Sequence, residues 1–363
     1  MDTEFKLSEY MNKGIENIVK GIVKASLRNP KETIFAVKYR QSSKEAQKKR
    51  AAMEQKGQKV PAFLIGSITS SCNLFCKGCY ARANKLCGER EEDKHLSAAR
   101  WAEIFREAQE IGVSFILLAG GEPLIRQEVI EKAAQVKDII FPIFTNGTML
   151  QEDYIALFDR HRNLVPILSI EGNAEQTDSR RGQGTYELLM DVMDKLNEKG
   201  ILYGASVTVT TRNARTVTSK SFFDTLYRKG CKAVIFVEFV PVTQDTKSLA
   251  PTDIERKLLE NGQQQLREAY ADVVFLSFPG DEKYSDGCLA AGRGFFHISA
   301  DGAAEPCPFS PYSDTNLKNA SLIDALSSPL FKKLEDTGML LGEHEGGCLL
   351  FQKEQEVRGL LEN

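Results

Sequence analysis

The strongest constraint on the fold is a regular alternation that begins at residue 62. Six short apolar runs rich in β-branched residues are each followed by a longer segment of helical period. The runs cover residues 62–69, 114–120, 139–147, 164–172, 201–210 and 231–241, and the helical segments lie near 97–112, 127–138, 151–161, 185–199, 215–229 and 251–270. Continuous apolar strands joined by helical crossovers predict an α/β fold with a parallel sheet. Six such units favour an open, partial (βα)6 barrel over a closed barrel of eight.

Unusual residues gather where these predicted strands end. The segments are Ser70–Cys79, Gly120–Pro123, Thr145–Gly147 and Ser169–Gly172. The carboxyl ends of parallel strands lie at one edge of a sheet, and ligands bind at that edge in folds of this kind. The sequence therefore predicts a single site at this mouth of the barrel.

The first sixty residues lie outside this alternation. Apolar residues at helical spacing between Ile15 and Val23 predict an amphipathic helix, which we expect to pack on the main domain or on a second subunit. Asn29 and Pro30 predict the cap and first turn of a second helix. Residues 38–59 carry eight Lys and Arg against two Glu, which favours a solvated helix face over a nucleic-acid or membrane-surface contact.

We therefore expect three parts: a helical extension over 1–60, the barrel over 61–271, and a small subdomain over 272–363. The chain is 42% apolar and 27% charged with a net charge of −3, a balance that gives no general attraction to nucleic acid or anionic membranes. The acidic start MDTEFKLSEY does not predict a signal peptide, and no apolar run approaches the roughly 20 residues that cross a bilayer. A cytoplasmic location follows, where clustered cysteines indicate metal binding or catalysis rather than disulfides.

The stretch CNLFCKGCY places Cys72, Cys76 and Cys79 on one loop after the first predicted strand. Cys76 and Cys79 alone would suit a thioredoxin-like redox pair, but the extra Cys72 and the absence of a following helix start argue against it. A structural zinc site would need a fourth ligand at finger or ribbon spacing, and three unrelated buried thiols are a further alternative. Three soft thiolates favour an iron–sulfur cluster with one iron left open for substrate or cofactor.

This loop resembles the C-x-x-x-C-x-x-C signature of the radical S-adenosylmethionine (radical SAM) superfamily, which Cys72, Cys76 and Cys79 match position by position. The resemblance implies an anaerobic oxidoreductase in which a [4Fe-4S] cluster binds S-adenosylmethionine. An electron from a donor such as flavodoxin or ferredoxin then cleaves it to a 5′-deoxyadenosyl radical, which takes a hydrogen atom from the substrate. The aromatic residue that usually precedes the third cysteine is replaced here by Gly78, and Tyr80 follows Cys79.

The same resemblance assigns the other strand ends to the cofactor. Gly120, Gly121, Glu122 and Pro123 are expected to hold the methionyl amine, because glycine admits close backbone approach and a carboxylate suits an ammonium group. Tyr80 belongs to the same expected set.

Three further positions complete the expected contacts. Ser169 and Glu171 resemble the polar residues that meet the ribose and the amine, with helix capping as the alternative role. Arg181 is expected to pair with the methionyl carboxylate, with Arg180 as its rival. Asn146 fits a cofactor contact and a turn residue equally well.

The last quarter carries a second cysteine pattern, Cys288-x13-Gly302-x4-Cys307, followed by Cys348. It resembles the start of the SPASM/Twitch extensions of some radical SAM enzymes, with a hairpin in FFHISADGAAEPC that turns at Asp301-Gly302. The chain has too few cysteines for a full SPASM domain. The resemblance therefore implies one auxiliary iron–sulfur cluster on Cys288, Cys307 and Cys348 with a fourth ligand missing from the pattern. Unrelated buried cysteines are the alternative.

The expected function is that of a radical SAM enzyme acting on a peptide or protein side chain or on a small metabolite. A non-catalytic iron–sulfur protein for electron transfer or sensing would not need the other strand-end residues. An RNA-modifying radical SAM enzyme would use the basic segment 38–59, although nucleic acid is not the expected partner.

Overall fold

A computed structural model describes residues 6–27, 29–84, 87, 94–278, 285–342 and 347–362. Within them the strands form one sheet in the order β7-β6-β5-β4-β3-β2-β1-β8-β9, open rather than closed. All neighbours pair in parallel except β8 and β9, which form an antiparallel hairpin. The strands are β1 (Phe63–Thr69), β2 (Phe115–Gly120), β3 (Phe141–Thr145), β4 (Leu164–Ser169), β5 (Gly204–Val209), β6 (Ala233–Glu238), β7 (Val274–Phe278), β8 (His297–Ile298) and β9 (Ala304–Glu305).

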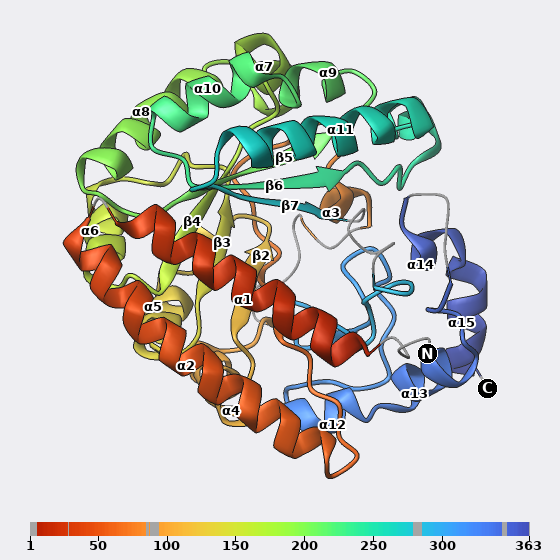
Figure 1. Ribbon diagram of the computed structural model, residues 1–363. Coiled ribbons are helices and arrows are strands. Elements are labelled where there is room, and N and C mark those ends of the chain that lie inside the picture. The colour runs from red at the N-terminus through yellow and green to blue at the C-terminus, as the bar shows by residue number, and fades with distance from the viewer. Residues whose placement is uncertain are drawn as a thin grey trace, which may run out of the picture.

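Helices connect the strands and form an arc outside them (Figure 1). The longer ones are α1 (Leu7–Ser26), α2 (Pro30–Glu54), α4 (Ala98–Ile111), α5 (Gln127–Gln135), α6 (Glu152–Arg160), α7 (Ala174–Arg181), α8 (Thr185–Glu198), α10 (Lys220–Arg228), α11 (Asp253–Ala269), α13 (Pro329–Asp336) and α15 (Glu354–Glu362). The short ones are α3 (Tyr80–Ala83), η2 (Pro123–Ile125), α9 (Ala214–Val217), η3 (Gln244–Leu249), α12 (Leu322–Leu326) and α14 (Leu349–Gln352). None of the described helices is long and apolar enough to cross a membrane.

The predicted alternation is confirmed, with additions. The six expected strands are β1–β6, but the helix expected over 215–229 is split into α9 and α10, because the Ser219 side chain caps α10 by accepting from the Phe222 N–H at 3.3 Å. Strand β7 was not expected. It pairs in parallel with β6 directly after α11, so the sheet continues past residue 271 into the segment assigned to the C-terminal subdomain. The division into three domains stays a prediction.

The two N-terminal helices lie where the sequence predicts them, side by side across the sheet (Figure 1). Asn29 caps α2 by accepting from the Lys31 N–H at 2.9 Å. The apolar stripe of α1, represented by Ile15 and Val19, packs against Phe115 and Val165 of the sheet, so it covers this chain's own barrel.

Polar contacts fix the same extension to the barrel. The buried Glu32 of α2 pairs with the buried Arg162 before β4, with 2.6 Å between Oε1 and Nη1. In the basic segment, Arg50 is buried and donates to Ser114 Oγ at 3.1 Å, whereas Lys44 and Lys48 are exposed. The segment is thus a mainly solvated helix face with one buried arginine.

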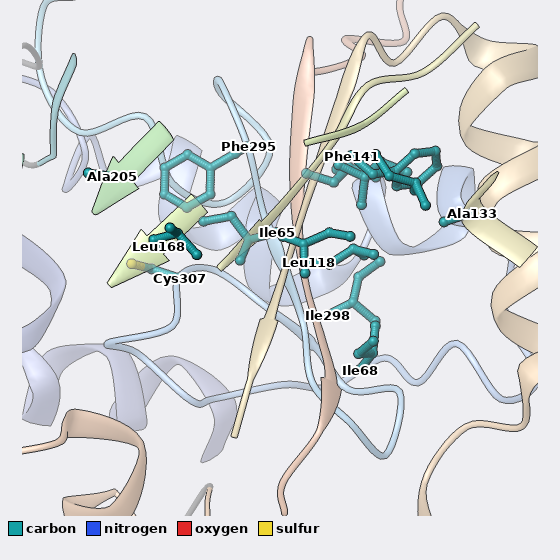
Figure 2. Close-up of a cluster of buried hydrophobic side chains, with 14 of the residues drawn as sticks. Ile65, Ile68, Leu118, Ala133, Phe141, Leu168, Ala205, Phe295, Ile298 and Cys307 are labelled. Atoms are coloured by element: carbon teal, nitrogen blue, oxygen red, sulfur yellow. The ribbon is translucent and has the colours of Figure 1, made fainter. Parts of the chain in front are cut away.

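The β8–β9 hairpin joins the C-terminal part to the barrel core. Strand β8 pairs with β1 through Ile65 and His297, and the Phe295 ring lies 5.1 Å from that of Phe63 and 5.6 Å from that of Phe278 in β7. Phe295 and Ile298 lie near Ile65 in one cluster of buried side chains (Figure 2). Each such fully buried side chain contributes roughly 1.5–3 kcal/mol, so barrel and hairpin share one core.

Candidate functional site

The cysteine loop begins directly after β1, and Cys72, Cys76 and Cys79 are half-buried free thiols on it. The loop is fixed through its backbone: the Lys77 N–H donates to the Arg180 carbonyl at 2.9 Å, and Arg82 Nη2 donates to the Leu74 carbonyl at 2.7 Å. Helices α7 and α3 therefore help to set the shape of the loop that carries the three thiols.

Gly120 and Gly121 let the end of β2 lie directly on this loop. A Cβ on Gly120 would stand 2.2 Å from the Thr69 carbonyl oxygen, and one on Gly121 would stand 1.9 Å from that of Ser71. The Gly121 N–H donates to the Thr69 carbonyl at 2.8 Å. These two glycines are thus needed for the close contact between the end of β2 and the cysteine loop. Their predicted contact with a cofactor stays a prediction.

Glu122 connects the ends of β2 and β3. Its buried carboxylate accepts from the Leu124 N–H at 3.1 Å and Thr145 Oγ1 at 2.7 Å through Oε1, and from the Asn146 N–H at 2.8 Å through Oε2. Burial raises the pKa of Glu122 to about 7. Pro123 follows it as the first residue of η2. The structure gives this carboxylate a positioning role, and its predicted contact with an ammonium group stays untested.

Asn146 has the turn role that the sequence left open. Its Oδ1 accepts from the Thr148 N–H at 2.9 Å, and its Nδ2 donates to Asn73 Oδ1 at 2.9 Å. Because Asn73 follows Cys72, this side chain also ties the end of β3 to the cysteine loop.

Ser169 is the half-buried last residue of β4, and Glu171 follows two residues later. The Glu171 carboxylate accepts hydrogen bonds from two arginines. Arg180 Nη1 donates to Glu171 Oε1 at 2.8 Å, and Arg181 donates to the same oxygen from Nε at 2.8 Å and Nη2 at 2.5 Å. Arg181 Nη1 also lies 4.0 Å from Cys76 Sγ. The structure thus brings Glu171, Arg181 and the cysteine loop together.

The other oxygen of this carboxylate, Glu171 Oε2, is buried and has no hydrogen-bond partner among the described residues. A buried carboxylate oxygen left unpaired is costly, so it indicates a donor that belongs to a ligand. An ammonium group or a ribose hydroxyl supplies such a donor, and the residues present therefore fit S-adenosylmethionine.

A residue that the sequence did not indicate, Phe239, lies against Gly78. Gly78 has a φ of +69°, and a Cβ there would stand 2.8 Å from the Phe239 ring. Phe239 follows β6 and is buried, with the Arg180 guanidinium 6.0 Å from its ring centre. The aromatic ring beside the third cysteine thus comes from another strand.

Tyr80 packs against Phe309 of the C-terminal part. Its ring centre lies 4.9 Å from that of Phe309. Burial, followed by the nearby thiolates of Cys79 and Cys307, raises the pKa of Tyr80, so the ring lies within electrostatic reach of both cysteine groups. Its contact with the cofactor stays a prediction.

Cys87 is a fourth thiol near the loop. It hydrogen bonds with Cys72, an interaction that lowers the pKa of Cys72 to about 6 and raises that of Cys87. No regular spacing connects Cys87 with the other three cysteines, which is why the sequence pattern left it apart.

Cys288, Cys307 and Cys348 are all buried free thiols. Burial, and then a hydrogen bond with Cys348, raises the pKa of Cys307, and Cys288 lies within electrostatic range of it. In the described part of the chain, no group of three or more His, Cys, Asp or Glu side chains surrounds a position for a single metal ion. The ligands of an iron–sulfur cluster bind different iron atoms and need not converge on one point. The auxiliary cluster therefore stays a prediction.

A hydrogen-bonded chain that the sequence did not indicate crosses three neighbouring strands. Ser67 Oγ of β1 lies 2.7 Å from His297 Nε2 of β8, and His297 Nδ1 lies 2.7 Å from Glu305 Oε2 of β9. His297 and Glu305 are 2% and 4% exposed. Ser67 and His297 line a cavity of about 20 Å³ together with Tyr80 and Gly120, which places the chain beside the predicted cofactor segment.

Residues 67–216, which contain the cysteine loop and the strand ends as far as Arg181, match the radical SAM superfamily. The chain is 26% identical to the AdoMet-dependent heme synthase of Methanosarcina barkeri over 316 residues, which cover 78% of this chain and 87% of that protein. It is 25% identical to the mycofactocin maturase MftC of Mycolicibacterium smegmatis, covering 69% of this chain and 58% of that protein.

The fold is also that of a solved enzyme. Streptococcus suis SuiB bound to S-adenosylmethionine superposes with a TM-score of 0.68 at 20% identity, over 86% of this chain and 79% of that one. The fold, the cysteine loop and these relatives agree. The chain therefore contains a radical SAM domain over residues 67–216, and the names of its relatives support an enzyme.

Proposed function

We propose that this enzyme binds a [4Fe-4S] cluster through Cys72, Cys76 and Cys79 and binds S-adenosylmethionine at the mouth of the barrel, to abstract hydrogen from a substrate. When bound, the two groups supply one-electron cleavage of the sulfonium and a 5′-deoxyadenosyl radical. The observation that carries this proposal is the position of Arg181 between Cys76 and Glu171, whose second oxygen is buried without a partner.

The strand-end side chains divide the work of holding the cofactor. Glu171 Oε2 accepts a hydrogen bond from the methionyl ammonium or a ribose hydroxyl, and Arg181 presents its charge to the methionyl carboxylate. The backbone of Gly120–Pro123 lines the methionyl amine, while Ser169, Asn146 and Tyr80 border the remainder. The fixed loop keeps these groups in place and limits the entry of water.

The Ser67–His297–Glu305 chain is suited to hold a proton released by a substrate. With His297 neutral, the Ser67 hydroxyl donates to Nε2, and after proton uptake the Nε2–H donates back to Ser67 Oγ, so no hydrogen bond is lost. Glu305 stabilises the imidazolium through Nδ1. Ser67 lines the cavity and is the entry point of this relay.

The substrate in this proposal is a peptide or protein side chain or a small metabolite. The names of the relatives support both classes, since one is a heme synthase and others are maturases, and a SuiB structure contains the precursor peptide SuiA. The proposal includes an auxiliary iron–sulfur cluster in a SPASM/Twitch-like C-terminal part, an electron donor such as flavodoxin or ferredoxin, and a cytoplasmic location.

The test is reductive cleavage by anaerobically reconstituted protein. With dithionite and S-adenosylmethionine, the wild type should form 5′-deoxyadenosine even without substrate. Replacement of Cys72, Cys76 and Cys79 together by Ala should abolish this product. The matched control is Cys231→Ala, because Cys231 is a buried thiol that donates to the Ala233 carbonyl at 3.2 Å. Cleavage that persists in the triple variant contradicts the proposal.

A further inference from the structure

The C-terminal cysteine group has a hydroxyl beside it that the proposed function does not use. Cys307-Pro308-Phe309-Ser310 forms a tight turn in which the Ser310 N–H donates to the Cys307 carbonyl at 2.9 Å. Cys307 and Ser310 are antiparallel bridge partners. Residues directly opposite in such a bridge carry their side chains on the same face, with Cβ atoms about 4.5–5.5 Å apart. The Ser310 hydroxyl therefore lies next to the Cys307 thiol.

This hydroxyl is buried without a partner. Ser310 is 1% exposed, and its Oγ makes no hydrogen bond to any residue that the structure describes. Other buried serines satisfy theirs: Ser26 donates to the Val23 carbonyl at 2.8 Å, and Ser285 donates to the Gly287 carbonyl at 3.1 Å. An unsatisfied buried hydroxyl is unfavourable, so a partner outside the described atoms is expected.

The surroundings of Ser310 identify that partner. Cys307, the bridge partner of Ser310, hydrogen bonds with Cys348 and lies within electrostatic range of Cys288, so Ser310 lies beside one member of a group of three thiols. Pro308 and Pro311 carry no N–H that could satisfy it, and the Phe309 ring within the turn packs 4.9 Å from that of Tyr80. Three thiolates leave one iron of a four-iron cluster without a protein ligand. The unpaired Ser310 Oγ is one oxygen donor, as many as that iron needs.

We propose that Ser310 Oγ is the fourth ligand of an auxiliary iron–sulfur cluster held by Cys288, Cys307 and Cys348. This rests on the part of the proposed function that assigns a cluster to these cysteines. On binding, the Ser310 oxygen forms a bond to iron and displaces a hydroxide ligand. The hydroxyl proton leaves with that hydroxide as water, so no electron is transferred.

The experiment uses the whole chain with Cys72, Cys76 and Cys79 replaced by Ala, so that only an auxiliary cluster can remain. Ser310→Ala and Ser310→Cys are added to this parent. The matched control is Ser313→Ala, because Ser313 lies three residues away and already donates to the Thr315 carbonyl at 2.7 Å. Iron and sulfide content, electron paramagnetic resonance of the reduced protein, and the hyperfine coupling of added ¹³C-cyanide are measured.

The parent and Ser313→Ala should hold about four irons and show no ¹³C coupling, because every iron has a protein ligand. Ser310→Ala should gain the coupling at an open iron, and Ser310→Cys should keep its iron with shifted resonance lines. A parent that already binds cyanide, or a Ser310→Cys spectrum identical to that of the parent, overturns the assignment of Ser310.

A parent without iron would overturn this inference together with the auxiliary cluster. That result is distinguishable from failure of the radical chemistry, because cleavage of S-adenosylmethionine by the wild type tests the first cluster separately. If Ser310→Ala fails to fold, the comparison of Ser310→Cys with the parent still decides the question.

Discussion

Arg181→Ala should weaken the binding of S-adenosylmethionine and leave the iron content unchanged. The guanidinium donates twice to Glu171 Oε1, and its Nη1 faces Cys76, where the methionyl carboxylate is proposed to bind. A charge-assisted hydrogen bond of this kind contributes about 1.5–3 kcal/mol. The dissociation constant should therefore rise roughly 10- to 150-fold.

Arg180→Ala is the matched control, because Arg180 donates to the same Glu171 oxygen at 2.8 Å. Its second contact goes to the Lys77 carbonyl at 3.1 Å rather than to a thiol, and its side chain is 18% exposed against 11% for Arg181. An ion pair nearer to solvent contributes about 0–1 kcal/mol, so the dissociation constant should change by no more than about fivefold.

The assay is anaerobic calorimetric titration of S-adenosylmethionine into reconstituted protein, with iron and sulfide measured on the same samples. Arg181→Lys should fall between the wild type and Arg181→Ala, because lysine keeps the charge but loses the planar fork. Equal losses in Arg180→Ala and Arg181→Ala, or loss of iron in Arg181→Ala, would refute the assignment and make Arg181 a support of the loop.

Gly121→Ala should sharply reduce iron incorporation, because the added Cβ would stand 1.9 Å from the Ser71 carbonyl oxygen. The control is Gly14→Ala in α1, where an added Cβ meets nothing within 4 Å. This control should raise the free energy of unfolding in urea by roughly 0.5–1 kcal/mol. Burial raises the pKa of Glu122 from its ordinary value of 4.5 to about 7 in the folded protein. The contribution of this group to the unfolding free energy is therefore fully present below pH 4.5 and is lost as the pH rises through 7. The unfolding free energy of the wild type should therefore fall relative to Glu122→Gln over that interval, by on the order of 3 kcal/mol, and parallel pH profiles would contradict this. Arg162→Ala should cost about 3–5 kcal/mol by leaving the buried Glu32 unpaired, and a loss below about 1 kcal/mol would show that this pair does not hold α2 on the barrel.

The parallel sheet was predictable because its strands are buried on both faces and read as continuous apolar runs. Strand β7 was not predicted, because in the described part of the chain it is not followed by a helix as each of the six predicted strands is. Helix α7 was missed for a different reason: AEQTDSRR buries only Thr177, so it has no apolar periodicity, and its capping box at Asn173 is its only strong local signal.

At the site, the contacts that the sequence could indicate join residues that lie close together along the chain. Spacing was enough to group the three loop cysteines, and the family resemblance added Glu171 and Arg181, which lie ten residues apart. Phe239 reaches Gly78 from β6, and His297 reaches Ser67 from β8, and both contacts depend on a sheet order that local patterns do not contain. The family resemblance assigned Glu122 to the methionyl amine, a contact that stays untested, and did not indicate that its carboxylate also accepts from the turn after β3, which only the fold brings near.

The pairing of β8 with β1 also sets an order of events during synthesis. Ser67 and His297 are 230 residues apart, so one edge of β1 stays unpaired until the hairpin has been made. At about 5–20 residues per second this interval is on the order of 10–50 s, during which an apolar strand edge is open to other chains. The cysteine loop, by contrast, is translated within a few residues of β1, long before the hairpin. The last strands to be translated therefore complete the Ser67–His297–Glu305 hydrogen-bonded chain and cover the free edge of β1.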